Sequence, residues 1–144
     1  MRARVCILPI LLGIACAGCG GSTSTKPASQ HTGLVNELPD KKGFFEIDTR
    51  TAGGTPAKRG ARATKAAPHP IVVHFYGPDG TTELTPAPTD VSIRIGGEGS
   101  AEVPLKPQSG GGFATEPGDY PTAFRGQLKA TIDGQTLEAP FMIR

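Results

Sequence analysis

The sequence lacks tryptophan, and it holds only six phenylalanines, two tyrosines and three cysteines in 144 residues. No cysteine lies beyond residue 19, so the body of the chain can form neither a disulfide nor a thiolate metal cluster. The scarcity of aromatic side chains limits any hydrophobic core to a modest, mostly aliphatic one. No window combines a sustained helical repeat with helix caps, so helical fold classes are not expected.

An excess of charge of one sign is also missing. Lysine and arginine number 15 and aspartate and glutamate 13, which gives a formal net charge of +2. Two of the cations, Arg2 and Arg4, stand in the first four residues, and without them the charges balance. A near-neutral body has no general electrostatic reason to bind nucleic acid or acidic substrates, so we expect no nucleic-acid partner.

The one long apolar run lies at the N-terminus. Behind the two arginines, residues 5–15 form an apolar stretch of 11 residues. A membrane-spanning helix needs ~20, and the shorter length is typical of a signal peptide. Small residues then precede a cysteine, which looks like a bacterial lipoprotein signal with a cysteine that becomes acylated, for example with palmitate. We predict a lipoprotein leader at residues 1–18 and a flexible tether at 19–30.

Two cysteines compete for acylation. Cys19 follows the small pair Ala17 and Gly18, whereas Cys16 has the less suitable Ile14 two places before it. We favour Cys19 as the lipidation site, with Cys16 as the alternative. The two also form a C-x-x-C, but redox chemistry needs a folded site that lowers a thiol pKa, and this pair ends an apolar leader. A plain cleaved secretory signal with Cys19 unmodified is a further alternative.

Short apolar and polar alternations with frequent turn signals fill residues 31–144. Val91, Ile93 and Ile95 alternate with polar residues, which indicates a strand with one buried face. Phe45 and Ile47 predict a similar inward face. The expected strands cover residues 34–38, 44–48, 71–76, 91–95, 101–105, 113–115 and both arms of a C-terminal hairpin. Seven or eight such strands predict an all-β fold, a single small antiparallel β-sandwich, with an immunoglobulin-like arrangement as one option.

The C-terminal hairpin is the most sharply specified of these elements. Asp133 and Gly134 form a two-residue turn signal, because both turn positions need a positive φ. A tight turn there places Gly126 opposite Phe141 and puts the apolar residues of both arms on one face. Turn chemistry and hydrophobic pattern thus agree on the register. Pro140 and Met142 are exceptions on the otherwise polar face.

Two loops invite a functional interpretation. Residues 51–69 carry four cations, Lys58, Arg59, Arg62 and Lys65, without an acid or a large apolar residue, and predict a flexible basic loop. It could contact phosphates, anionic lipid or an acidic partner, but we favour a solvated insertion, because no aromatic accompanies the cations. In the loop at 116–121, Tyr120 could anchor a partner, but we favour a cover for the end of the sandwich.

The start "HTGLVNELPDKKGFFEI" and the end "FRGQLKATIDGQTLEAPF", taken with the leader, resemble a group of small bacterial lipoproteins. Those proteins often begin the mature domain with a His-Gly-Gly-like turn and end in a "GEL…I-x-G-x…F" hairpin. The resemblance covers residues 31–144 and implies a β-sandwich-like domain. Some similar proteins are rich in histidine near this start, which points to metal handling. Here that pattern is reduced to His31-Thr32-Gly33, and we transfer no functional residues.

Patterns of catalytic and metal-binding residues are missing as well. There is no G-x-S-x-G elbow, and His31, His69 and His74 lack metal-ligand spacing. We therefore predict no catalytic residue, metal site or cofactor. The expected function is a non-enzymatic binding or scaffolding module of the bacterial envelope, anchored to a membrane through Cys19 and facing the periplasm or the exterior. The alternative is a periplasmic accessory for copper or zinc that uses His31, His74 and Met142.

Overall fold

The computed structural model describes residues 26–31, 33–49, 68–97, 99–121 and 123–144. The predicted leader, Cys16, Cys19 and most of the predicted basic loop lie outside the described residues. The described helical structure is a short 3-10 turn, η1, at Pro39–Lys41. Among the described residues, no helix is long and apolar enough to cross a membrane.

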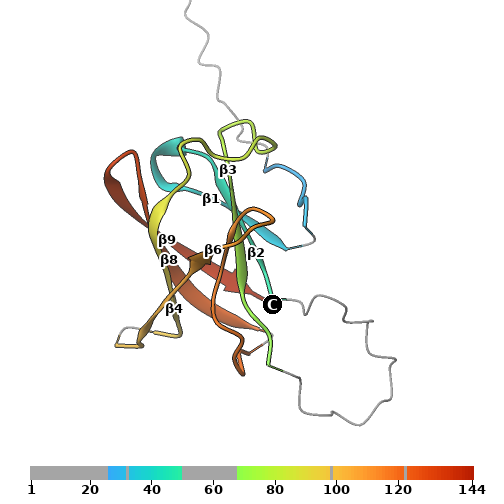
Figure 1. Cartoon of the computed structure of the whole chain (residues 1–144), viewed down its shortest axis with the longest axis vertical. Helices are drawn as coiled ribbons and strands as arrows, with labels where there is room; N and C mark the ends of the chain where they lie inside the picture. The colour runs from blue at the N-terminus through green and yellow to red at the C-terminus, as the bar shows by residue number, and fades with distance from the viewer. Residues whose placement is uncertain (1–25, 32, 50–67, 98, 122) are drawn as a thin grey trace, which may run out of the picture.

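Two antiparallel sheets form the predicted small β-sandwich (Figure 1). The first sheet has the strand order β1-β2-β3-β7-β6, and the second has the order β5-β4-β8-β9. The strands are β1 (Leu34–Glu37), β2 (Phe44–Asp48), β3 (Val72–Tyr76), β4 (Thr89–Ile95), β5 (Glu102–Pro104), β6 (Lys106–Pro107), β7 (Phe113–Ala114), β8 (Phe124–Ile132) and β9 (Gln135–Ile143). The all-β class and the sandwich are therefore confirmed.

The strand order is that of an immunoglobulin sandwich. Without β1, the sheets read β2-β3-β7-β6 and β5-β4-β8-β9, which correspond to the immunoglobulin strands A-B-E-D and C′-C-F-G. The predicted strand at 101–105 is split, because the chain crosses from the second sheet to the first at the buried Leu105. This crossing bridges one side of the sandwich. On the opposite side, β1 and β9 form two neighbouring sheet edges.

Tyr120 adds a second immunoglobulin feature. It lies in the connection from β7 to β8, and its hydroxyl donates a hydrogen bond to the carbonyl oxygen of Glu116 at 3.1 Å. This is the geometry of a tyrosine corner. The ring packs on the core and meets the ring of His69 edge to face, with centroids 6.2 Å apart. Tyr120 thus covers the core, as we favoured from the sequence, and the buried His69 belongs to the fold rather than to a loop.

The main core lies between the sheets and is mostly aliphatic. It contains the inward residues of the C-terminal hairpin, and Gly126 faces Phe141 in the predicted register. Asp133 and Gly134 have φ values of 53° and 74°, as their turn requires. The two arms are long and adjacent in sequence, so turn chemistry and side-chain pattern were sufficient to define this element.

Candidate functional site

The N-terminal segment, defined here as residues 26–31 with Gly33, lies over the outer face of the first sheet (Figure 1). The side-chain amide of Gln30 donates hydrogen bonds to the carbonyl oxygens of Gly80 and Thr81, at 3.3 and 3.1 Å. On the same face, Val35, Phe44 and Tyr76 form a second buried apolar cluster. Packed structure therefore begins within the range predicted as a tether.

Glu46 holds this segment to the sheet. The residue lies on β2 and is fully buried, with 0% of its surface exposed. Its carboxylate accepts hydrogen bonds from five groups. These are the Ser29 hydroxyl, the backbone N–H groups of Gln30 (3.0 Å), His31 (3.0 Å) and Gly33 (2.6 Å), and the Tyr76 hydroxyl (3.3 Å). Backbone N–H groups that converge in this way form a nest for an anion.

The hydrogen bonds that Glu46 accepts determine the direction of its pKa shift. Burial alone would raise the pKa of its carboxyl group, because the charged form loses water. The hydrogen bonds from Ser29, Gly33, Gln30 and His31 outweigh burial and hold the pKa below its ordinary value. Burial of its hydroxyl, followed by the charge of Glu46 and the hydrogen bond to Glu46, raises the pKa of Tyr76 to about 12. Glu46 is thus an anion at neutral pH, and it orders the chain just before β1.

His31 and His74 form a stacked pair beside Glu46. Their ring centroids are 3.9 Å apart and their planes differ by 13°. His74 lies on β3 directly opposite Glu46 in the β2–β3 register. Burial, followed by the charge on His31, lowers the pKa of His74, against the opposing effect of Glu46, Glu83 and Asp48. The structure therefore brings together two of the three residues named for the metal-handling alternative.

The stacked geometry does not direct the two rings at one metal ion. The lone pairs of imidazole lie in the ring plane, and a metal must sit about 2.0–2.1 Å from each nitrogen. Two nearly parallel rings with centroids 3.9 Å apart share no such point. Met142 belongs to β9 in the other sheet, where its sulfur accepts a hydrogen bond from Arg144 at 3.4 Å. Within the described ranges, no group of three His, Cys, Asp or Glu side chains could hold a metal ion.

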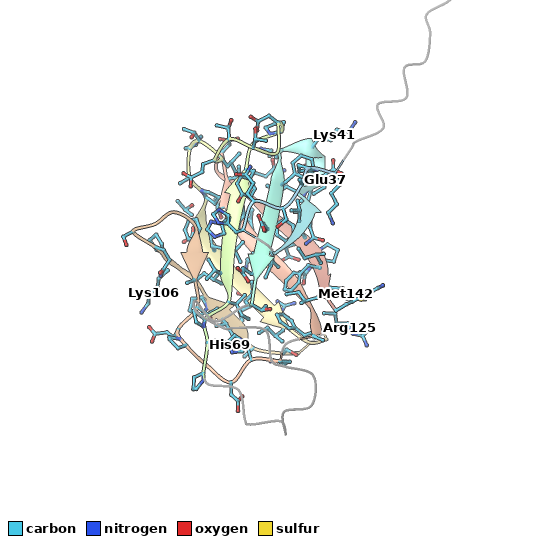
Figure 2. All side chains as sticks on the ribbon, turned by 90° about the vertical axis from the view of Figure 1, so that its right-hand side faces the viewer. Glu37, Lys41, His69, Lys106, Arg125 and Met142 are labelled. Atoms are coloured by element: carbon cyan, nitrogen blue, oxygen red, sulfur yellow. The ribbon has the colours of Figure 1, made fainter. Side chains whose placement is uncertain are left out.

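A groove with a volume of about 1010 Å³ opens at the side of the sandwich where β1 and β9 lie next to each other. Its apolar lining comes from Leu34, Ile47, Pro140, Phe141, Met142 and Ile143. Of the large apolar side chains in the described part of the chain, the two that are exposed, Leu34 (38%) and Met142 (47%), both line it. Arg125 and Met142 point outward at one end of the molecule, away from Lys41 (Figure 2). We call this feature the β1–β9 groove.

The β1–β9 groove is cationic. Three arginines line it, Arg94, Arg125 and Arg144, against a single acid, Asp48. Arg94 is held by Glu102 at 3.0 Å and donates to the Gln127 side-chain oxygen at 3.3 Å. Arg125 and Arg144 are exposed, and within the described residues neither forms an ion pair.

Neither Glu46 nor the groove arginines were identified from the sequence. Alternation with the inward Phe45 and Ile47 predicts only an outer position for Glu46, where a polar side chain is ordinary. A signal for the groove was present, because Pro140 and Met142 break the polar pattern of the hairpin's outer face, and both line the groove. An apolar interruption of a polar face can mark a contact surface.

The lowered pKa of His74 also makes the stability of the fold depend on pH. A histidine whose pKa is lowered in the fold binds protons more readily when unfolded, so its contribution is complete above its ordinary pKa of 6.5 and decreases below it. Glu46 contributes above its ordinary pKa of 4.5 and loses that contribution as the pH falls through and below this value. We expect urea unfolding of the full chain to show both decreases between pH 8 and pH 3.

Two variants show which residue causes each decrease in the free energy of unfolding. His74→Phe should remove the decrease that begins near pH 6.5, and Glu46→Gln should reduce the decrease below pH 4.5. A free energy of unfolding that stays constant from pH 7.5 to pH 5.5 would show that His74 is not buried as described.

Two connected features thus make up the candidate site. The buried Glu46 fixes Gly33, and Gly33 and Leu34 then form one wall of the β1–β9 groove. Searches of protein-family models, of curated proteins and of solved structures found no match to this chain.

Proposed function

We propose that this chain is a lipid-anchored lipoprotein of the bacterial envelope that binds a partner in the β1–β9 groove and catalyses no reaction. The leader supports the anchor, because two arginines, a short apolar stretch and small residues precede Cys19. Each buried CH₂ of an acyl chain contributes about 0.8 kcal/mol, so several chains would hold the protein to a membrane. The domain would face the periplasm or the exterior.

One observation carries the binding role. The two exposed large apolar side chains of the described residues, Leu34 and Met142, come from different sheets and meet in one groove beside three arginines. Concave surfaces that combine apolar lining with a few polar groups are the usual sites of ligand and partner binding.

Two acids that catalysis could use, Glu46 and Asp79, serve the fold instead, which supports a non-enzymatic role. Glu46 is occupied by the N-terminal segment. Asp79 accepts hydrogen bonds from the backbone and hydroxyl groups of Thr82 and Thr81, which hold the pKa of its carboxyl group well below its usual range. These carboxylates stabilise turns and segments, as capping acids do.

The sheet edges favour recognition by side chains over addition of a strand. In a two-residue hairpin the residues that flank the turn are hydrogen-bonded to each other, so the even-numbered residues of β9 direct their backbone groups to the outer edge. Pro140 occupies such a position and offers no N–H there. On β1, the Asn36 side chain donates to the Leu34 carbonyl oxygen at 3.3 Å. Both edges are thus partly blocked.

The anchor is tested by mass spectrometry of the protein purified from membranes. We expect the mature chain to begin at Cys19 and to carry acyl chains on that residue. Cys19→Ala should leave the leader uncleaved and the chain without acyl groups, whereas Cys16→Ala serves as the matched control and should mature normally. An unmodified Cys19 in the wild-type protein, or acylation at Cys16, would overturn the assignment.

A further inference from the structure

We infer that the occupant of the β1–β9 groove is an extended acidic peptide segment of another protein, with carboxylates at alternate positions and apolar residues between them. This inference rests on the proposed binding role of the groove and names its partner by chemistry. It follows from the charge of the groove, from the spacing of its cations and from the composition of the rest of the chain.

The charge of the groove calls for an anionic occupant. Three arginines line the groove against Asp48, and the exposed Arg125 and Arg144 are available to a partner. Arginine presents a planar fork of donors that matches a carboxylate in two hydrogen bonds. Because these groups lie at an exposed rim, they would act on encounter rate and orientation as well as on affinity.

The cations are spaced along the strands rather than gathered at one point. Arg94 lies opposite Gln127, which lies opposite Pro140, and this row crosses the outer face of the second sheet. The next row on the same face pairs Arg125 with Met142. Arg94 is already paired with Glu102. The two groove arginines without an ion pair among the described residues are Arg125 and Arg144, and Arg144 lies two residues beyond Met142, so they fall in successive rows about 6.8 Å apart.

That repeat distinguishes between anionic ligands. An extended peptide presents alternate side chains at the same spacing, so its acidic residues can meet successive arginines while its apolar residues reach Leu34 and Met142. A fatty acid or similar amphiphile carries one headgroup and would leave the second row of the groove without a counterpart. The periodic arrangement therefore favours the peptide.

The chain itself does not supply this occupant. The residues outside the described ranges contain one acid, Glu98. The sequence that follows Thr49 in the lining carries Arg50, Lys58 and further cations, which a cationic groove repels. We therefore place the acidic segment in another protein.

The test uses the full mature chain in phosphatidylcholine nanodiscs and a fluorescein-labelled peptide, (Glu-Val)₄. We expect saturable binding that weakens with salt, and no binding of the matched peptides (Gln-Val)₄ and (Lys-Val)₄. Arg125→Glu should weaken binding about tenfold or more, and Arg125→Gln by less. Lys41→Glu is the matched control, because it makes the same charge change at an exposed site far from the groove (Figure 2), and it should change binding less than twofold.

Three results would overturn the inference. The first is equal binding of (Gln-Val)₄, and the second is a dissociation constant that Arg125→Glu leaves unchanged while thermal unfolding shows the variant folded. The third is binding of dodecanoate, sensitive to Arg125→Glu, with no binding of (Glu-Val)₄. This last outcome would keep the proposed binding role of the groove and replace the peptide by an amphiphile. Acylation of Cys19 is measured separately by mass spectrometry. A failure of the predicted anchor is therefore distinguishable from a failure of the peptide inference.

Discussion

Replacing Glu46 by alanine should lower the free energy of unfolding by about 3–5 kcal/mol. The substitution removes the common acceptor of five donors, and three of these are backbone N–H groups of Gln30, His31 and Gly33. A buried donor that loses its partner costs about 1–3 kcal/mol, and water entering the gap recovers part of this loss. Urea unfolding of the full chain, followed by circular dichroism, measures the effect.

Two comparison variants separate the lost anion from lost volume. Glu46→Gln keeps the side-chain shape and one oxygen acceptor, and it should lose about half as much stability. Glu138→Ala removes an exposed carboxylate that accepts one hydrogen bond from Gln127, and it should change stability by no more than about 0.5 kcal/mol. Equal losses in Glu46→Ala and Glu138→Ala would show that the N-terminal segment does not depend on Glu46.

Glu46 also connects the packing of the first sheet to the groove. Its carboxylate fixes the N–H of Gly33, and the next residue, Leu34, is one of the two exposed apolar side chains in the groove. A Cβ on Gly33 would lie 2.4 Å from the Ile47 carbonyl oxygen, so the backbone passes too close to β2 for any other residue. Loss of Glu46 should therefore weaken the proposed binding in the groove, although Glu46 does not line it.

The parts of the fold that followed from the sequence are those in which the information is local. In the C-terminal hairpin, turn residues and side-chain period lie within 20 consecutive residues and agree on one register. The inward residues Phe45, Ile47 and Ile93 were found from alternation alone. The immunoglobulin-like order could be offered only as an option, because pairing such as that of β3 with β7 joins strands far apart in sequence.

The role of Glu46 could not be read from its own strand. Alternation places it with Phe44 on the outer face, and an outer face is usually solvated. Here the N-terminal segment covers that face, through hydrogen bonds between residues 13 to 17 positions apart. The neighbouring pair Phe44 and Phe45, which places a large apolar side chain on each face of β2, was the available signal that both faces are buried.

The cationic character of the groove could not be predicted from the net charge of the chain. Lysine, arginine, aspartate and glutamate nearly cancel over the whole chain. The fold nevertheless separates them, because Glu46 is enclosed under the N-terminal segment while Arg125 and Arg144 remain exposed beside the groove. Net charge excludes a general attraction to anions, but it does not describe the field of one concave surface. The lack of a general electrostatic reason to bind acidic substrates is therefore a statement about the whole chain and not about this groove.

Phe45→Ala should lower the free energy of unfolding by about 3–5 kcal/mol. The cause is a loss of apolar packing, whereas Glu46→Ala removes a hydrogen-bond acceptor. Phe45 is the next residue on β2, it is also 0% exposed, and it points into the main core, where it lies opposite Phe75 on β3. Truncating its ring removes apolar contacts and leaves a cavity that a close-packed sandwich fills only in part. Urea unfolding measures the loss.

The matched control for Phe45→Ala is Leu34→Ala, on the neighbouring strand β1. Leu34 is 38% exposed, so its truncation should lower the free energy of unfolding by less than about 1 kcal/mol while weakening the proposed binding in the groove. Phe45→Ala should instead lower stability without a matching loss of affinity under conditions where it remains folded. Equal destabilisation by the two variants would contradict the arrangement, because it would place Phe45 outside the packed core or Leu34 inside it.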